Sequence, residues 1–294
     1  APFVIGKAEQ AFTKQMTVFD SALGARFPNP KIEKEFGTDT MPQTSDNLAA
    51  DYDLSREDCD TFAYQSQQKY AAAKADGFFD GEIHAVTVPG GRKQPDTVVE
   101  EDEFPRPDTQ IEKLAALRTL NPSGVTTAAN ASGLNDGAVA MVVASQSAGE
   151  SVGETPLVRI LSSGVAGVPP RIMGYGPVPA AEIALKRAGL TMADMDVIEI
   201  NEAFAAQVLA CTHAWEDPLY CQQSLNQLDA VGKIPKDRLN VNGGSIALGH
   251  PIGATGSMLI GTVLDELERR DKTTGLVTMC AAGGMAPAII IERV

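Results

Sequence analysis

Residues 197–205 read VIEINEAFA, and this stretch decides how the sequence on either side is interpreted. Four mainly apolar residues, typical of a strand, are followed at once by polar Asn201 and then by a run typical of a helix. In open α/β sheets, ligand sites lie just beyond the carboxyl ends of the strands. Asn201 is therefore a candidate site residue, although this segment alone equally allows a simple helix N-cap.

Around this stretch the sequence alternates between strand-like and helix-like segments, which predicts a layered α/β domain. We expect strands at 156–162, 197–200, 275–280 and 288–293, and helices at 179–188, 202–215 and 252–269.

Two apolar features predict close packing. Residues 138–144, AVAMVVA, form a continuous apolar run, as expected for a strand buried on both faces. Gly253, Ser257 and Gly261 share one face of the last expected helix. Because glycine destabilises a helix interior by roughly 1 kcal/mol, this face is expected to pack against a neighbouring backbone.

The first 120 residues are polar and interrupted by prolines. Helices are expected at 44–51, with Thr44 or Ser45 as N-cap, and at 56–76, with Ser55 as N-cap.

Composition excludes several classes of protein. The 294 residues contain 24 Lys+Arg and 38 Asp+Glu, a net charge of −14, which disfavours sequence-independent nucleic-acid binding. The four cysteines form no CxxC pair and no zinc-finger spacing, so we expect no metal, and reduced thiols in a cytoplasmic protein. No apolar run has the length of a membrane span.

Two further segments contain chemically reactive side chains. In NVNGGSIALGHPIGATG, residues 240–256, His250 lies between Gly249 and Pro251, which favours an exposed catalytic imidazole over a structural one. In CAAGGM, residues 280–285, Cys280 ends an expected strand and enters a turn of small residues. Backbone N–H groups in such a turn can bind a substrate oxygen, although an inert buried thiol is the alternative. The remaining cysteines lack this context and are expected to be structural: Cys59, Cys211 and Cys221.

Together with NASGLNDG at 130–137, these segments resemble the thiolase family in order and spacing, over essentially the whole chain. The resemblance is greatest to the 3-oxoadipyl-CoA and acetyl-CoA acetyltransferase branch. It implies an acyl-CoA C-acetyltransferase that cleaves 3-ketoacyl-CoA or condenses acetyl-CoA. It also implies the thiolase fold, a layered α/β/α/β/α arrangement. The domains would be a CoA-binding loop domain at 1–133, the final strand and helix of the N-terminal domain at 134–158, and the C-terminal domain at 159–294.

The resemblance also assigns roles. Cys280 matches the family's acid/base cysteine, His250 the histidine that activates the nucleophile, and Asn201 the asparagine that holds a water in the same oxyanion hole. Ala282 and Gly283 lie where backbone N–H groups form the other oxyanion hole, with Ala282 replacing a common glycine. Coenzyme A is a substrate, and no cofactor is expected. The positions that match the pantetheine channel are Met41, Ala128, Ser132, Gly133, Met173, Ala203 and Phe204.

The family's nucleophilic cysteine matches no residue of this sequence. By resemblance it belongs to an N-terminal segment ahead of residue 1, so the N-terminal half is expected to be incomplete. We expect the missing half to come from another chain or to have been removed, and the chain alone to be inactive. A homodimer or tetramer is expected.

Several alternatives stay open. The insertion 216–239 and the CAAGG ending resemble the corresponding segments of β-oxidation thiolases. Asn201 does not fit that branch, which often has histidine at this position. Decarboxylating condensing enzymes share the fold but lack a cysteine like Cys280. A catalytically silent CoA-binding subunit remains possible.

Overall fold

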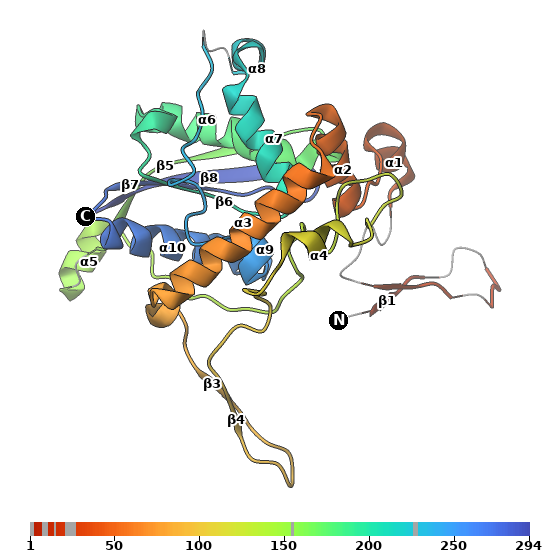
Figure 1. Ribbon diagram of the computed structural model, residues 1–294, viewed down its shortest axis with the longest axis horizontal. Coiled ribbons are helices and arrows are strands. Elements are labelled where there is room, and N and C mark those ends of the chain that lie inside the picture. Colours follow the sequence, from red (N-terminus) through yellow and green to blue (C-terminus); the bar gives the residue numbers. More distant parts are fainter. Residues whose placement is uncertain (1–2, 8–10, 15, 21–27, 154–155, 226–228) are drawn as a thin grey trace.

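A four-stranded mixed sheet forms the centre of the C-terminal half (Figure 1). The computed structural model describes residues 3–7, 11–14, 16–20, 28–153, 156–225 and 229–294. The sheet has the order β5-β8-β7-β6, in which β6 and β7 are parallel and β8 is antiparallel to both β7 and β5. The strands are β5 (Val158–Gly167), β6 (Val197–Ile200), β7 (Thr274–Thr278) and β8 (Met285–Arg293).

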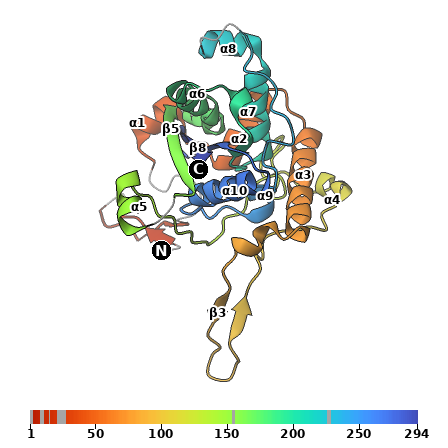
Figure 2. The ribbon, with the colours of Figure 1, turned by 90° about the vertical axis from the view of Figure 1, so that its left-hand side faces the viewer.

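Helices cover both faces of this sheet (Figure 2). On one face lie α6 (Pro177–Ala188) and α7 (Ala205–Glu216), and on the other lies α10 (Thr255–Arg269). Successive side chains of a strand point to opposite faces. Accordingly, Ile198 of β6 belongs to the apolar core shared with α6 and α7, whereas Val197 belongs to the core shared with α10. The end of β6 is therefore held rigidly from both sides.

The other helices and strands surround this unit. The remaining helices are α1 (Pro30–Phe36), α2 (Met41–Asp51), α3 (Arg56–Ala75), α4 (Ile111–Ala115), α5 (Gln146–Val152), α8 (Pro218–Ser224) and α9 (Ser245–Leu248). Two antiparallel hairpins are formed by β1 (Phe3–Ile5) with β2 (Val18–Asp20) and by β3 (Val86–Val88) with β4 (Thr97–Val99). Among the described residues, the 3₁₀ helices are η1 (Phe78–Gly81), η2 (Pro170–Tyr175) and η3 (Met192–Asp194). No helix within these described ranges is both long and apolar enough to cross a membrane.

Most predicted elements are confirmed, with shifted ends. Helix α3 begins after Ser55, whose hydroxyl accepts the Asp58 N–H as predicted. Helix α2 begins earlier than predicted, because Thr40 and Gln43 form a capping box and Pro42 lies in the first turn. Its N-cap is Thr40, so the prediction of Thr44 or Ser45 is wrong.

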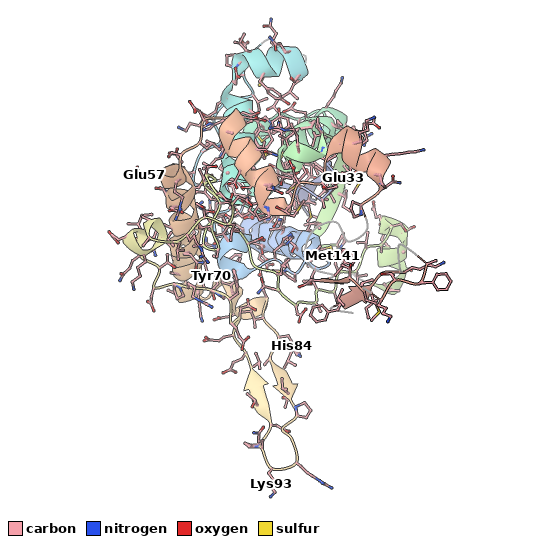
Figure 3. The ribbon with its side chains drawn as sticks, turned by 90° about the vertical axis from the view of Figure 1, so that its right-hand side faces the viewer. Glu33, Glu57, Tyr70, His84, Lys93 and Met141 are labelled. Carbon is pink, nitrogen blue, oxygen red and sulfur yellow. The ribbon has the colours of Figure 1, made fainter. Side chains whose placement is uncertain are left out.

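The predicted strand at 138–144 is wrong. This segment has no regular secondary structure, and Val142 is 95% exposed. A buried strand needs neighbouring strands that accept and donate its backbone hydrogen bonds. No described strand pairs with residues 138–144, so the apolar run follows the surface as an extended segment ending at α5. Met141 marks this segment in Figure 3.

The predicted close packing of the small-residue face of α10 is also wrong. A methyl group placed on Gly261 of α10, or on Gly253 just ahead of the helix, would meet no atom within 4 Å. The helix packs on the sheet through its opposite, apolar face, which includes Leu259, Val263 and Leu267. These two glycines therefore have no neighbour packed closely against them in the described part of the chain.

Candidate active site

The end of β6 places Asn201 beside the end of β7. The Asn201 N–H donates to the Thr278 carbonyl over 2.9 Å, which extends the parallel pairing by one residue beyond β6. Cys280 lies two residues after Thr278, so it follows the end of β7, the strand that pairs with β6. Helix α7 begins later, with Phe204 as its N-cap. The interpretation of Asn201 as a simple helix cap is therefore wrong.

A glycine turn positions His250. Gly249 has φ +95°, and a side chain there would lie 2.5 Å from the Asn135 Oδ1. The same Oδ1 accepts the backbone N–H of His250 over 3.0 Å. Only glycine lets the chain pass this close to Asn135, so the turn fixes the backbone from which the imidazole projects.

Both nitrogen atoms of the His250 ring have polar neighbours. The Nε2 lies 3.5 Å from the Asn201 Nδ2, and the Nδ1 lies 2.7 Å from the Thr255 Oγ1. The Ser245 hydroxyl donates to the Asn201 Oδ1 over 2.6 Å. Burial lowers the pKa of His250, which favours the neutral imidazole. A neutral ring can accept a proton, as a general base must.

Cys280 lies in a small apolar cluster. It is 5% exposed and packs with Ala131, Met173, Ala203 and Phe204, while the partly buried Met41 packs against the same cluster. Burial raises the pKa of the Cys280 thiol to about 12, so the protonated thiol predominates. A thiol in this state can serve as a proton donor. The structure thus gathers four of the predicted channel residues, Met41, Met173, Ala203 and Phe204, around the predicted acid/base cysteine.

The turn after Cys280 presents backbone donors. Ala281 and Met285 exchange backbone hydrogen bonds, and Gly283 and Gly284 have φ values of +86° and +88°. Both Ala282 and Gly283 are exposed, and no hydrogen bond among the described residues uses their N–H groups. These two donors are therefore available to a substrate oxygen, which is the geometry that an oxyanion hole requires.

The segment 130–133 runs alongside residues 203–205. The Ala205 N–H donates to the Asn130 carbonyl over 2.9 Å, and the Ser132 N–H donates to the Ala203 carbonyl over 3.0 Å. A side chain at Gly133 would lie 2.3 Å from the Phe104 ring. The pairing brings Ser132 and Gly133 beside the apolar cluster that contains Cys280.

Ala128 lies at the start of the same segment and lines a separate cavity of about 250 Å³. The residues that line this cavity with it include Phe104, Arg106, Ala129 and Ile246. The run 128–133 therefore connects this cavity with the surroundings of Cys280.

Buried hydrogen bonds to Glu202 hold the segments that carry the site residues. The Glu202 carboxylate accepts hydrogen bonds from Ser66, Asn240 and the Ile246 N–H. A side chain at Gly244 would lie 2.3 Å from the Glu202 Cδ, which explains the second glycine of the NGG sequence. These contacts fix residues 240–246 against the end of β6.

Sequence reasoning missed the residues that hold the site residues in place. Asn135, Ser245 and Thr255 contact His250 or Asn201 directly. Each lies within a motif that the sequence did single out, but only their spatial neighbours reveal these contacts. The other histidines lie elsewhere: Figure 3 shows His84 near the base of the β3–β4 hairpin, which carries Lys93 at its tip. Among the described residues, no group of three or more His, Cys, Asp or Glu side chains is arranged to hold a metal ion.

Comparisons with known proteins identify the family. The description "Thiolase, N-terminal domain" matches residues 12–147, and "Thiolase, C-terminal domain" matches residues 154–293. A β-ketoadipyl-CoA thiolase of Pseudomonas aeruginosa is 48% identical over 295 residues, covering 100% of this chain and 69% of the relative. A 3-oxoadipyl-CoA/3-oxo-5,6-dehydrosuberyl-CoA thiolase of Escherichia coli is 45% identical, covering 100% of this chain and 70% of the relative.

Comparison with solved structures gives the same family. The crystal structure of human mitochondrial 3-ketoacyl-CoA thiolase matches with a TM-score of 0.84 and 36% identity, covering 100% of this chain and 68% of that one. The same human enzyme in complex with CoA matches with a TM-score of 0.82 and 37% identity, with the same coverage. The fold and the relatives define an acyltransferase enzyme with the thiolase fold. The chain belongs to the thiolase family, on the branch of the 3-oxoadipyl-CoA thiolases.

Proposed function

We propose that this chain carries the acid/base and oxyanion-binding part of an active site that cleaves 3-ketoacyl-CoA with CoA. The observation that carries the proposal is the placement of the Asn201 amide 3.5 Å from the His250 Nε2, at the strand ends that also lead to Cys280. The amide and the imidazole come from two distant segments and meet there, and Cys280 follows β7, the strand that pairs with β6. This set suits proton transfer around a thioester carbonyl.

Cys280 serves as the acid in the cleavage direction. After a nucleophilic thiolate attacks the 3-keto carbon, the bond between carbons 2 and 3 breaks and leaves a carbanion at carbon 2. The Cys280 thiol donates its proton there and becomes a thiolate. It then takes the proton of incoming CoA, whose sulfur attacks the enzyme-bound thioester. The high pKa supports this role, because a protonated thiol must be available at neutral pH.

His250 and Asn201 stabilise the negative charge that develops on one carbonyl oxygen of the reacting groups. The backbone N–H groups of Ala282 and Gly283 stabilise the charge on the other carbonyl oxygen. His250 first takes the proton of the nucleophilic cysteine. Its Nε2–H then donates to the developing oxyanion, with Asn201 holding a water beside it. Free, exposed N–H groups at Ala282 and Gly283 support the second oxyanion role.

CoA is proposed to approach along segment 128–133. Support comes from the position of Ala128, Ser132 and Gly133 between the cavity and the cluster that contains Cys280. A solved thiolase of the same fold has been crystallised with CoA. We propose 3-oxoadipyl-CoA as the substrate, because the similar relatives from Pseudomonas and Escherichia are named for it.

The nucleophilic cysteine is proposed to come from a segment outside residues 1–294. The three other cysteines, Cys59, Cys211 and Cys221, are free and buried. Burial raises the pKa of Cys59 to about 12, and the Cys211 and Cys221 thiols donate to backbone carbonyls. A nucleophile needs the thiolate instead, in an electropositive and accessible place.

The test is thiolysis of 3-oxoadipyl-CoA by this chain combined, on the same or a second polypeptide, with the segment that supplies the nucleophilic cysteine. The reaction is monitored by the loss of the 3-ketoacyl-CoA enolate absorbance. Cys280→Ser should lower kcat by roughly 10²- to 10⁴-fold, the usual contribution of a positioned acid or base. Cys221→Ser is the matched control and should retain activity, since Cys221 is buried against α7 and its hydroxyl replacement can keep the same donor role. Unchanged turnover by Cys280→Ser would overturn the acid/base role, and turnover by the 31.0 kDa chain alone would overturn the external nucleophile.

A further inference from the structure

Four hydrogen-bonded contacts run without a break from Ser245 to the carbonyl of Pro251, through Asn201, His250 and Thr255. The Ser245 Oγ lies 2.6 Å from the Asn201 Oδ1, and the Asn201 Nδ2 lies 3.5 Å from the His250 Nε2. The His250 Nδ1 lies 2.7 Å from the Thr255 Oγ1, which lies 3.0 Å from the Pro251 carbonyl oxygen. The imidazole is thus held between a serine-supported amide and a carbonyl-supported hydroxyl.

The Pro251 end fixes the direction of proton donation. A carbonyl oxygen only accepts, so the single hydrogen of the Thr255 hydroxyl is donated to it. The Thr255 Oγ1 then faces the ring with a lone pair and can only accept from the Nδ1. This carbonyl is itself held in place, because it also accepts the backbone N–H groups of Ala254 and Thr255 in the first turn of α10.

The Ser245 end gives the same direction independently. When the serine hydroxyl donates to the Asn201 Oδ1, the amide nitrogen is turned toward the ring. An amide NH₂ group only donates, so a hydrogen bond across this contact in the free protein needs the His250 Nε2 as acceptor. Both ends therefore require the tautomer with hydrogen on Nδ1 and a lone pair on Nε2.

We infer that Thr255 is a positioning residue that sets the tautomer of His250, with Ser245 setting the orientation of the Asn201 amide. Its catalytic meaning rests on the proposed function. With the lone pair on Nε2, the ring can take the proton of a cysteine S–H, which leaves a thiolate and an imidazolium. The Nδ1–H···Oγ1 hydrogen bond persists through this step. Protonation of Nε2 breaks the 3.5 Å contact with the Asn201 amide, because both groups are then donors, and both can donate toward the oxyanion or its water. The opposite tautomer would present an N–H to the thiol and could not act as base.

The tautomer can be measured without any activity. The chain has only three histidines, so long-range ¹H–¹⁵N correlation spectra of ¹⁵N-labelled protein resolve each ring, with His250→Asn assigning the signals. The wild type should show a protonated Nδ1 and a pyridine-type Nε2 at neutral pH. Thr255→Val, which is isosteric, should lose this preference and show mixed or Nε2–H tautomers. Thr255→Ser should keep it.

Two controls distinguish a change of tautomer from a loss of folding. The signals of His84 and His213 report whether Thr255→Val remains folded. If that variant unfolds, the wild-type spectrum still tests whether the His250 ring carries its hydrogen on Nδ1. An Nε2–H ring in the wild type, or an unchanged tautomer in folded Thr255→Val, would overturn the inference.

In the active enzyme, Thr255→Val should lower kcat up to about 10²-fold, with rescue by Thr255→Ser. If thiolysis of 3-oxoadipyl-CoA is not found, the proposed function fails but the tautomer result still stands by itself. If Thr255→Val changes the tautomer but leaves kcat unchanged, the catalytic part of the inference is overturned.

Discussion

Burial shifts the pKa values of His250 and Cys280 in directions that suit a base and an acid. The pKa of His250 is lowered because burial disfavours the imidazolium, whereas that of Cys280 is raised because burial disfavours the thiolate. The same physical cause therefore leaves both groups neutral at pH 7. One can then accept a proton and the other can donate one.

The lowered pKa of His250 predicts a pH dependence of stability. Since its folded pKa lies below its unfolded value near 6.5, the unfolded state binds more protons as the pH falls, and acidification destabilises the fold. The contribution is present above pH 6.5 and is lost as the pH falls through the folded pKa. His250→Asn should flatten this slope between pH 5 and 7, measured by denaturant unfolding. His84→Asn, in the exposed region at the hairpin base, is the control and should leave it unchanged.

The buried Glu199 of β6 predicts a dependence of stability on pH that is opposite in sign to that of His250. It is 1% exposed, neither carboxyl oxygen has a hydrogen-bond partner in the described structure, and burial raises its pKa well above the usual value. The folded state therefore holds a proton that the unfolded state releases above about pH 4.5, so stability falls as the pH rises.

Glu199→Gln should remove this loss. Relative to wild type, the variant should gain about 1.4 kcal/mol in unfolding free energy at pH 8 for each unit by which the pKa is raised, and little at pH 4. Urea unfolding at the two pH values measures the difference. Glu112→Gln on the exposed side of α4 should show no such gain, and an equal gain there would contradict the assignment to Glu199.

At the scale of elements, the turn between β7 and β8 combines two glycines with different constraints. Gly283 and Gly284 both have left-handed φ values, but a methyl group on Gly283 meets nothing, whereas one on Gly284 lies 2.0 Å from the Val168 carbonyl oxygen. The turn therefore needs its second glycine for close approach to the end of β5 as well as for conformation.

A matched pair of substitutions separates these effects. Gly283→Ala should destabilise the fold by about 1–2 kcal/mol, the usual cost of the left-handed region. Gly284→Ala should cost a further ~1–3 kcal/mol, because the backbone must move to relieve the clash. Thermal unfolding measures both. Equal losses for the two variants would show that the contact with Val168 is unimportant.

The helices show where sequence patterns are reliable. The N-cap of α3 and the apolar face of α10 depend on residues that are close in sequence, so they can be predicted locally. The structure confirms both helices. The open face along Gly253 and Gly261 contradicts the expected packing, because small residues permit a close approach without specifying a partner.

At the scale of the whole molecule, the apolar segment 138–144 lies on the surface. Val142 is 95% and Val143 is 70% exposed, and contiguous exposed apolar residues favour association or aggregation. Substitution of both by Ser should lower self-association of the isolated chain, measured by sedimentation velocity and by binding of a hydrophobic dye.

The fold itself should tolerate this change, because neither side chain packs in a core. The melting temperature should therefore change little. Val263→Ser is the contrasting variant: Val263 is fully buried between α10 and the sheet, so its replacement should lower the melting temperature markedly. A large loss of stability in the Val142 and Val143 variant would show that the segment packs more firmly than its exposure indicates.

The sequence alone determined the family and the alternation of strands and helices in the C-terminal half, and it named the three side chains of the candidate site. These follow from local signals: apolar periodicity, caps, and motifs whose chemistry is visible residue by residue. Asn201, His250 and Cys280 could be named because each follows a strand or precedes a helix in a distinctive context.

Only the tertiary structure decided which residues hold them in place, and which apolar segments find a partner. Thr255 and Ser245 orient the site through contacts between positions up to 44 residues apart, and the segment 138–144 stays exposed where its pattern predicted burial. A sequence pattern records what a residue can bury or bond, but burial and hydrogen bonding need a second surface, and that surface is supplied only when distant segments pack together.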